Sequence, residues 1–517
     1  MNKNIWFKIL ALALATVFCL SLLVACKGDG SKDGADNGTK DVEDDVVDSN
    51  AESDVLDGVR YNGEVVRVLS WDPSNLEEYV SEFMAGSHVV EQKTYERMVK
   101  TKNQLNIGVE WIEEPGNGAN MTTFIQKAVN GMLVNDYDVI CCYSSAAADL
   151  TMSGYTANLM NYETMDFTQE WYPQNLVEDC TMNGKLYFCT GDISTNLINM
   201  TSMVFFNHSL VADYRINDTI QSTYGEKDLY DLVRKGKWTH DAMLTLAKTV
   251  STSNGMGIAT ENDTVGISTY STLLCNFYYG MGYKTINVSD EGVKLSEDYM
   301  DSGKMVELLE YWGTPLHRSE YGFFCNSHDS AAKMFYEGRS LFSLAPASHA
   351  YKFHAPKGME FGALPVPLGE NGDPDDPVYY SVHSRPYSMF LIPSGSSKAE
   401  ISASFIHCLG KISYETTRPA IINTTMKGRY ASVTADDAEM WDYIIDSQVF
   451  DMGRIYETVF NRQIGTNSDG AAIYRPNTDL FQVRLGEGNN NWASIIEKYK
   501  PELEKQCKDI NDKMIYQ

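Results

Sequence analysis

The sequence predicts an α/β protein built around a parallel β-sheet. The first observation is that β-rich runs alternate with helical patterns between residues 65 and 142. The second is size: 517 residues with a 43% apolar share suffice for about two to four domains with large cores, which excludes a wholly disordered chain. The third is a net charge of −28, which excludes a generic nucleic-acid binder because such binding needs Lys and Arg to neutralise phosphates.

Three strands and two helices are expected in the first part of the chain. Apolar residues at helical spacing occupy residues 95–105 and 124–132. The β-rich runs around them are residues 65–69, 108–112 and 137–142. This β-α-β-α-β order predicts a parallel sheet with right-handed crossovers, and ligands of such sheets bind beyond the carboxyl ends of the strands. The loops that begin at Ser70 and Tyr143 are those ends.

The rest of the chain continues to alternate strands and helices. Thr239 is a candidate N-cap, and Asp241 suits the positive end of the helix that follows. A second helix is expected to end at Gly338. Strands are expected at residues 185–188, 203–206, 341–344, 362–367 and 389–392, and further helices at residues 396–409 and 492–503.

The N-terminus has the pattern of a secretory signal. Lys3 and Lys8 precede an apolar run over residues 9–24, which is short for a membrane-spanning helix of about 20 residues. The sequence Leu-Val-Ala-Cys ending at Cys26 resembles a bacterial lipobox. That resemblance implies cleavage after residues 1–25 and a diacylglycerol and palmitate anchor on Cys26. An ordinary signal peptide with a chance cysteine is the alternative.

Residues 26–58 are expected to form an acidic flexible tether. Between residues 27 and 57 there are eleven acidic residues, three lysines and no aromatic residue. Such a segment cannot bury enough apolar surface to become ordered, and its like charges extend it away from an anionic membrane. The alternative, a sink for cations, has no fixed ligand spacing to support it.

The cysteines do not form the framework of a disulfide scaffold. Removal of the signal and lipidation of Cys26 would leave eight cysteines in about 490 residues. Cys180 and Cys189 flank a Gly turn and could pair, whereas Cys141 and Cys142 are expected to be buried thiols. The sequence has no Cys-x-x-Cys, so we expect neither a structural zinc site nor any other cofactor.

Six segments together resemble the extracellular solute-binding proteins of bacterial ABC transporters, in the broad sugar-binding family. Their order along residues 65–410, behind a lipobox, carries the resemblance. Ala242 departs from the pattern where an acidic residue is usual, and Phe188-Cys189 replaces Gly-Leu-Pro. The matching segments are the N-G-K-L-Y phrase at 182–189, the strand at 204–210, the W-T helix start at 238–243, the F-x-x-G element at 334–342, the P-x-P element at 362–367 and the I-P element at 392–400.

The resemblance implies a type II periplasmic-binding-protein-like fold. Two α/β lobes, each a mostly parallel sheet flanked by helices, would close over a ligand about a hinge. Lobe 1 would comprise residues 59–190 and 388–430, and lobe 2 residues 191–387 and 431–517. The chain would cross between the lobes near residues 186–193, 382–387 and 428–432.

Candidate ligand-binding residues are those that lie at predicted strand ends or that the resemblance places at the cleft, and that suit a sugar, which combines apolar C–H faces with a rim of hydroxyls. Trp71 is expected to stack on the sugar from a solvent-facing loop, with Asp72 as a hydroxyl acceptor; packing of Trp71 on its own loop is the alternative. Loop or helix capping is the alternative for Ser144 and Ser145, and core packing is the alternative for Tyr278 and Tyr279. The other candidates are Ser144, Ser145, Asp192, Tyr278, Tyr279, Ser348, His349, Arg385, Tyr387 and Tyr430.

These observations predict a substrate-binding lipoprotein of an ABC importer that captures a sugar or oligosaccharide and catalyses nothing. The chain has no HExxH, GxSxG or GxxxxGK[ST] motif. Expected partners are the solute and the transmembrane permease, with a lipid anchor at the extracellular face of the cell membrane, no nucleic acid, and a monomeric state. A peptide receptor, a secreted glycoside hydrolase and an adhesive surface lipoprotein remain alternatives, because paired carboxylates can come together on folding.

Overall fold

The computed structural model describes residues 54–71, 78–79, 88–252, 255–354, 359–430, 433–460, 463–466, 472–474 and 480–514. These residues belong to one compact unit, Asp54–Gln517. The predicted signal peptide, Cys26, the tether before Asp54 and Asp72 lie outside the described residues. In the described part of the chain, no helix is both long and apolar enough to cross a membrane.

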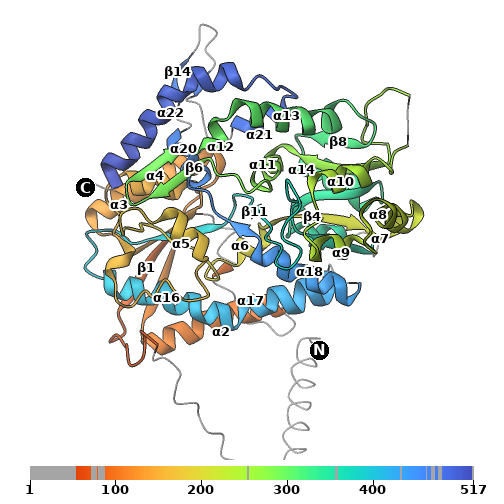
Figure 1. Cartoon of the computed structure of the whole chain (residues 1–517). Helices are drawn as coiled ribbons and strands as arrows, with labels where there is room; N and C mark the ends of the chain where they lie inside the picture. Colours follow the sequence, from red (N-terminus) through yellow and green to blue (C-terminus); the bar gives the residue numbers. More distant parts are fainter. Residues whose placement is uncertain are drawn as a thin grey trace, which may run out of the picture. The chain divides into compact units, whose positions relative to one another are not determined.

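The first sheet has the strand order β12-β3-β1-β2. Figure 1 labels its strand β1. β1 (Val65–Ser70) lies between β2 (Gly108–Glu113) and β3 (Val139–Tyr143) and is parallel to both. β12 (Ser388–Leu391) returns from far along the chain and pairs antiparallel with β3. The predicted strands and their parallel pairing are confirmed. We call this sheet and the helices packed on it, including α2 (Val89–Leu105), α3 (Met121–Val134) and α16 (Ala399–Glu415), the first lobe.

The second sheet has the order β10-β4-β9-β5-β8 and, with its helices, forms the second lobe. β9 is antiparallel to β4 and parallel to β5, so this sheet is mixed. The two lobes confirm the α/β fold expected from the resemblance. The strands are β4 (Ser202–Asn207), β5 (Val265–Tyr270), β8 (Gly322–Cys325), β9 (Ser340–Pro346) and β10 (Phe361–Leu364), and the helices against them include α10 (His240–Ala247), α13 (Ser302–His317) and α14 (His328–Tyr336).

The remaining elements are short or connect the lobes. The helices are α4 (Ala146–Met152), α5 (Gln174–Cys180), α6 (Thr195–Asn199), α7 (His208–Asp213), α8 (Ile216–Tyr224), α9 (Leu229–Arg234), α11 (Asn276–Tyr279), α12 (Glu297–Met300), α15 (His349–His354), α17 (Thr417–Pro419), η5 (Ala420–Tyr430), α18 (Ala435–Asp446), α19 (Met452–Ile455), α20 (Glu457–Phe460), α21 (Leu480–Gly486) and α22 (Ala493–Met514), with 3-10 turns η2 (Gly118–Asn120), η3 (Leu159–Asn161) and η4 (Ser271–Leu273). Two hairpins are formed by β6 (Ile286–Ser289) with β7 (Gly292–Leu295) and by β14 (Gln463–Thr466) with β15 (Ala472–Tyr474).

A two-stranded ribbon lies where the chain passes between the lobes. β11 (Ser381–Val382) pairs in parallel with β13 (Gln448–Val449). His383, the residue after β11, forms a bridge with Thr201, the residue before β4. After β13 the chain reaches α20, which packs against α4 of the first lobe. The residues after β13 therefore contact the first lobe as well as the second. The proposed lobe boundaries stay a prediction.

Two expectations about the segment before the first crossing are wrong. Residues 185–188 do not form a strand: Asn183 and Gly184 make the predicted tight turn with positive φ, but only a single bridge, Met182 to Lys185, closes it. The extended segment that follows buries its apolar side chains in the first lobe and meets the first sheet only through one isolated bridge, between Cys189 and Phe390 of β12. Cys180 and Cys189 are both free, as are all the cysteines among the described residues. Cys141 and Cys142 are buried, as predicted.

One buried cation ties the first crossing to the first lobe. Arg97 of α2 is buried and donates hydrogen bonds to the carbonyl oxygen of Ile193 at 3.2 Å and to Ser413 Oγ at 2.9 Å. It also donates to the carbonyl oxygen of Glu78, in the loop after β1. A single side chain therefore holds together α2, α16, the loop after β1 and the first crossing.

We predict that Arg97→Met lowers the free energy of unfolding by about 3 kcal/mol, because it leaves two buried carbonyl groups without a donor. Urea denaturation of the two proteins measures the difference. Arg60→Met is the control, because the Arg60 guanidinium makes only an exposed bond to the carbonyl oxygen of Asn103, and it should change stability by less than about 0.5 kcal/mol. Equal stability of wild type and Arg97→Met would contradict this role.

Candidate functional site

The carboxyl ends of strands from both lobes lie against the crossing segments. In the first lobe, Ser144 follows β3, and its hydroxyl donates to the carbonyl oxygen of Arg385 at 2.5 Å. In the second lobe, Ser348 follows β9, and its amide donates to the carbonyl oxygen of Asn199 at 2.8 Å. We use the name strand-end site for the predicted residues at these strand ends and at the second crossing: Ser144, Ser145, Arg385 and Tyr387, which line one small cavity, and Ser348 and His349 of the second lobe, which do not line it.

The solvent-facing position predicted for Trp71 is wrong. Its side chain is only 2% exposed, and its indole N–H donates to Ser388 Oγ at 2.9 Å. The ring also packs edge-on against Tyr143, with 5.1 Å between the ring centroids. Ser388 begins β12, the strand that returns beside β3, so this strand supplies the partner that covers the indole. The loop beyond it, including Asp72, lies outside the described residues.

We predict that Trp71→Ala destabilises the ligand-free protein by about 3–5 kcal/mol, the usual cost of truncating a buried Trp. Urea unfolding followed by far-UV circular dichroism measures this. Trp71→Phe keeps an aromatic ring and loses the N–H bond to Ser388, so its cost should be smaller. An unchanged stability of Trp71→Ala would show that Trp71 is not part of the core and would restore the first interpretation.

Four predicted residues meet in the first lobe around a carboxylate that the sequence did not single out. Ser145 Oγ donates to Glu457 Oε1 at 3.1 Å, and the Arg385 guanidinium pairs with the same carboxylate. Ser144, Ser145, Arg385 and Tyr387 all line one small cavity. Its volume of about 20 Å³ is room for about one water molecule. In this conformation Glu457 of α20 takes the polar contacts that Ser145 and Arg385 would offer to a sugar.

The structure places Tyr278 and Tyr279 in the core, which was the alternative to a place in the cleft. Both side chains of α11 are buried, and their hydroxyl groups have protein partners. Tyr278 donates to the carbonyl oxygen of Lys284 at 2.8 Å, and Tyr279 donates to Asp451 Oδ1 at 3.3 Å. The side chain of Tyr430, another candidate, is not among those described.

His349, a predicted ligand-binding residue of the second lobe, has a ring nitrogen without a hydrogen-bond partner among the described residues. Its ring is 4% exposed and stacks on Tyr270, with 6.1 Å between centroids and 20° between planes. Among the described residues, Nδ1 has no hydrogen-bond partner. Burial, with the nearby Lys352 and His328, lowers the pKa of His349 to about 3. The imidazole is therefore neutral at pH 7, and its one unprotonated ring nitrogen can accept a hydrogen bond from a hydroxyl group.

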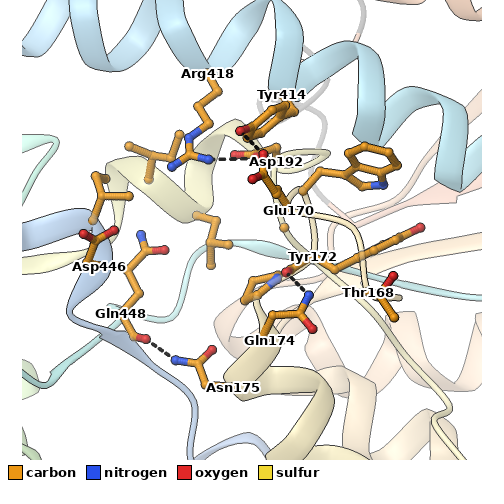
Figure 2. A pocket seen from close by; sticks show the side chains of 16 residues that line it. Thr168, Glu170, Tyr172, Gln174, Asn175, Asp192, Tyr414, Arg418, Asp446 and Gln448 are labelled. Atoms are coloured by element: carbon orange, nitrogen blue, oxygen red, sulfur yellow. Dashed lines mark hydrogen bonds and ion pairs between the residues drawn. The ribbon is translucent and has the colours of Figure 1, made fainter. Parts of the chain in front are cut away.

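Asp192 lies apart from these residues, in a larger hollow of about 540 Å³ (Figure 2). Its side chain is 11% exposed, and one carboxylate oxygen lies 3.6 Å from the Arg418 guanidinium. Burial raises the pKa of Asp192 to about 7, although Arg418 and Arg97 both act to lower it. The walls come from the first crossing, from the loop before α5, from α16 and α17, and from the end of α18 with β13.

This larger hollow and the strand-end site lie on opposite faces of the β11–β13 ribbon. Gln448 lines the larger hollow, and Val449 lines the small cavity beside Ser144. The two are consecutive residues of β13, and successive side chains of a strand point to opposite faces. We therefore call the larger cavity the hinge-side hollow. Asp192 cannot contact the same small solute as Ser144.

Sequence reasoning missed most residues of the hinge-side hollow. Trp171 and Tyr172 precede α5, and Tyr414 and Arg418 lie almost 250 residues later at the end of α16 and in α17. The only local indication was the run of aromatic and amide residues at 171–175, ahead of the Asn-Gly turn. Among the described residues there is no group of three or more His, Cys, Asp or Glu that could hold a metal ion.

Comparison with known proteins finds similar folds but no matching sequence. No protein-family model matches the chain, and no curated protein sequence matches it. Its structure is similar to that of a cyclo/maltodextrin-binding protein complexed with maltotetraose, with a TM-score of 0.52 and 11% identity over 88% of this chain and 99% of that one. It is also similar to a family 1 extracellular solute-binding protein from Bifidobacterium longum subsp. infantis, with a TM-score of 0.50 and 12% identity over 86% and 100%. These likenesses confirm the two-lobed fold.

Proposed function

We propose that the chain is the extracellular solute receptor of an ABC importer and that its solute is a sugar or oligosaccharide. The observation that carries this proposal is the fold: two α/β lobes whose strand ends face a shared set of crossings, over almost the full length of a maltodextrin-binding protein. Such a receptor binds its solute, closes and docks on a permease. It acts as a monomer and catalyses no reaction.

The strand-end site is the proposed place for the solute. It combines hydroxyl groups of the first lobe with the His349–Tyr270 pair of the second lobe. Neutral donors and acceptors beside an aromatic ring are the groups that a sugar needs. Rotation about the crossings would bring the two walls together over the ligand.

The carboxylates near this site favour a receptor over a glycoside hydrolase. Glu78 accepts hydrogen bonds from Ser194 Oγ at 2.8 Å and from the amide of Asn196 at 3.0 Å. Glu457 is bonded to Ser145 and Arg385. A hydrolase requires a pair of carboxyl groups aimed at one glycosidic bond. Both of these carboxylates instead hold protein segments together.

We predict that an oligosaccharide such as maltotetraose, or another member of a sugar panel, raises the melting temperature of the mature protein without being hydrolysed. His349→Phe should weaken that binding about tenfold, the value of one neutral hydrogen bond, as measured by isothermal titration calorimetry. Because the pKa of His349 is about 3, its contribution should stay constant from pH 5 to pH 8.

His317→Phe is the matched control, because the ring of His317 bonds to the carbonyl oxygen of Leu485 on α21. It can change stability, but it should leave sugar affinity unchanged. Stabilisation by peptides and by no sugar would support a peptide receptor instead. Release of reducing ends would make the protein a hydrolase and would overturn the proposal.

We further propose that Cys26 is the lipid-bearing N-terminus of the mature receptor at the extracellular face of the membrane. The lipobox-like sequence and the acidic tether support this. Cys26→Ser should move the protein from the membrane fraction to the medium or leave it unprocessed, since stable anchoring requires more than one acyl chain. Fractionation followed by intact-mass analysis measures this. Normal processing with unchanged membrane retention would contradict the anchor.

A further inference from the structure

The hinge-side hollow has the size of a ligand site and walls from both lobes. Its volume of about 540 Å³ lies within the usual range of about 300–1,000 Å³ for small-molecule sites. Tyr414 and Arg418 come from the first lobe, whereas Asp446 comes from α18, which packs on the second lobe. Figure 2 shows these side chains around one open space, with Asp192 between Arg418 and Tyr414. The hollow lies on the face of the β11–β13 ribbon opposite the strand-end site, so it is a separate site.

The side-chain amides around the hollow already donate hydrogen bonds within the protein. The side-chain amide N–H groups of Gln174 bond to backbone carbonyl groups, among them that of Tyr172 at 3.0 Å. Asn175 donates to the carbonyl oxygen of Gln448, and Gln448 donates to Thr201 Oγ1 at 2.6 Å. The side-chain carbonyl oxygens of these three amides make no hydrogen bond within the described part of the chain. The walls therefore offer these amide oxygens as acceptors, and the Trp171 indole N–H and the Arg418 guanidinium as donors without a hydrogen-bond acceptor among the described residues.

The carboxylates of the hollow outnumber its cations. Glu170, Asp192 and Asp446 line it with Arg418 as the one guanidinium. At 3.6 Å, the contact between Asp192 and Arg418 is longer than a charge-assisted hydrogen bond of about 2.7–2.9 Å. Among the described residues, the largely buried carboxylate of Asp192 accepts no hydrogen bond. Burial has raised its pKa to about 7 because the two nearby arginines do not fully offset the loss of water.

A ligand that matches these walls carries a positive charge for the excess of carboxylates and hydroxyl groups, which can donate to the amide oxygens and accept from Trp171 and Arg418. An ammonium group would pair with Asp192 and Asp446, and ring hydroxyls would donate to the amide oxygens. Tyr414, which already carries the Arg418 guanidinium 5.2 Å from its ring centroid, offers an aromatic face to a sugar ring. A monosaccharide ring has the size and the hydroxyls for this space. We propose that the hinge-side hollow is a second binding site of this protein and that its ligand is an amino sugar in the ammonium form.

The test compares three sugars that share one ring and differ at one substituent. Glucosamine hydrochloride, glucose and N-acetylglucosamine are titrated into the mature protein by calorimetry at pH 7.5. Glucosamine should bind with a stoichiometry of one and at least tenfold more tightly than the other two. Equal affinity for the three sugars, or no binding of glucosamine, would overturn the proposal.

Variants locate the binding. Asp446→Asn and Asp192→Asn should each reduce the preference for glucosamine to less than threefold. Asp442→Asn is the matched control, because Asp442 is an exposed acid one turn earlier on α18 that pairs with Lys427 and does not line the hollow. It should leave the preference unchanged. A preference that survives both variants of the hollow would overturn the proposal.

The outcome is separable from the proposed receptor function. His349→Phe, at the strand-end site, should leave glucosamine binding unchanged while it weakens binding of the transported sugar. If His349→Phe abolishes glucosamine binding and Asp446→Asn does not, the amino sugar binds at the strand-end site. That result would refute the second site and leave the receptor function in place.

Discussion

The two-residue pairing of β11 with β13 is the constraint on which the arrangement of both sites depends. Ser381 pairs with Gln448 and Val382 with Val449, and the hydroxyl of Ser447 donates to Ser381 Oγ at 2.9 Å. Because a strand alternates its side chains, this register assigns Gln448 to one hollow and Val449 to the other. A shift of one residue would exchange the two faces. The ribbon therefore separates the small cavity beside Ser144 from the hinge-side hollow.

The first lobe was largely predictable because its signals are local. β1, α2, β2, α3 and β3 follow one another within 80 residues, and each has a clear period of two or 3.6. The N-cap at Thr239 was likewise predictable, since its hydroxyl accepts from the amide of Ala242 three residues later. The missing strand at residues 185–188 shows the limit. An extended apolar segment forms a strand only if a partner strand runs beside it, and here only two isolated bridges, Met182–Lys185 and Cys189–Phe390, flank the segment.

Of the candidate site, the sequence could predict only the residues that directly follow a predicted strand. Ser144 and Arg385 were each expected at the cleft, and the Ser144 hydroxyl bonds to the carbonyl oxygen of Arg385 although 241 residues separate them. It could not show that the Glu457 carboxylate would bond to Ser145 and Arg385. Nor could it show that Ser388, 317 positions after Trp71, would accept a hydrogen bond from the indole. Asp192 was expected in the same cleft, but the ribbon places it on the other face. Each of these outcomes depends on long-range pairing, which no local pattern encodes.

The central claim is that the lobes close over a sugar held at the strand ends. Small-angle X-ray scattering of the mature protein, with and without each member of an oligosaccharide panel, measures closure directly. The account predicts that a sugar that binds also lowers the radius of gyration, by about 1 Å, as expected for hinge closure of two lobes. Saturation with a bound sugar and an unchanged radius of gyration, or a decrease produced by peptides alone, would contradict it.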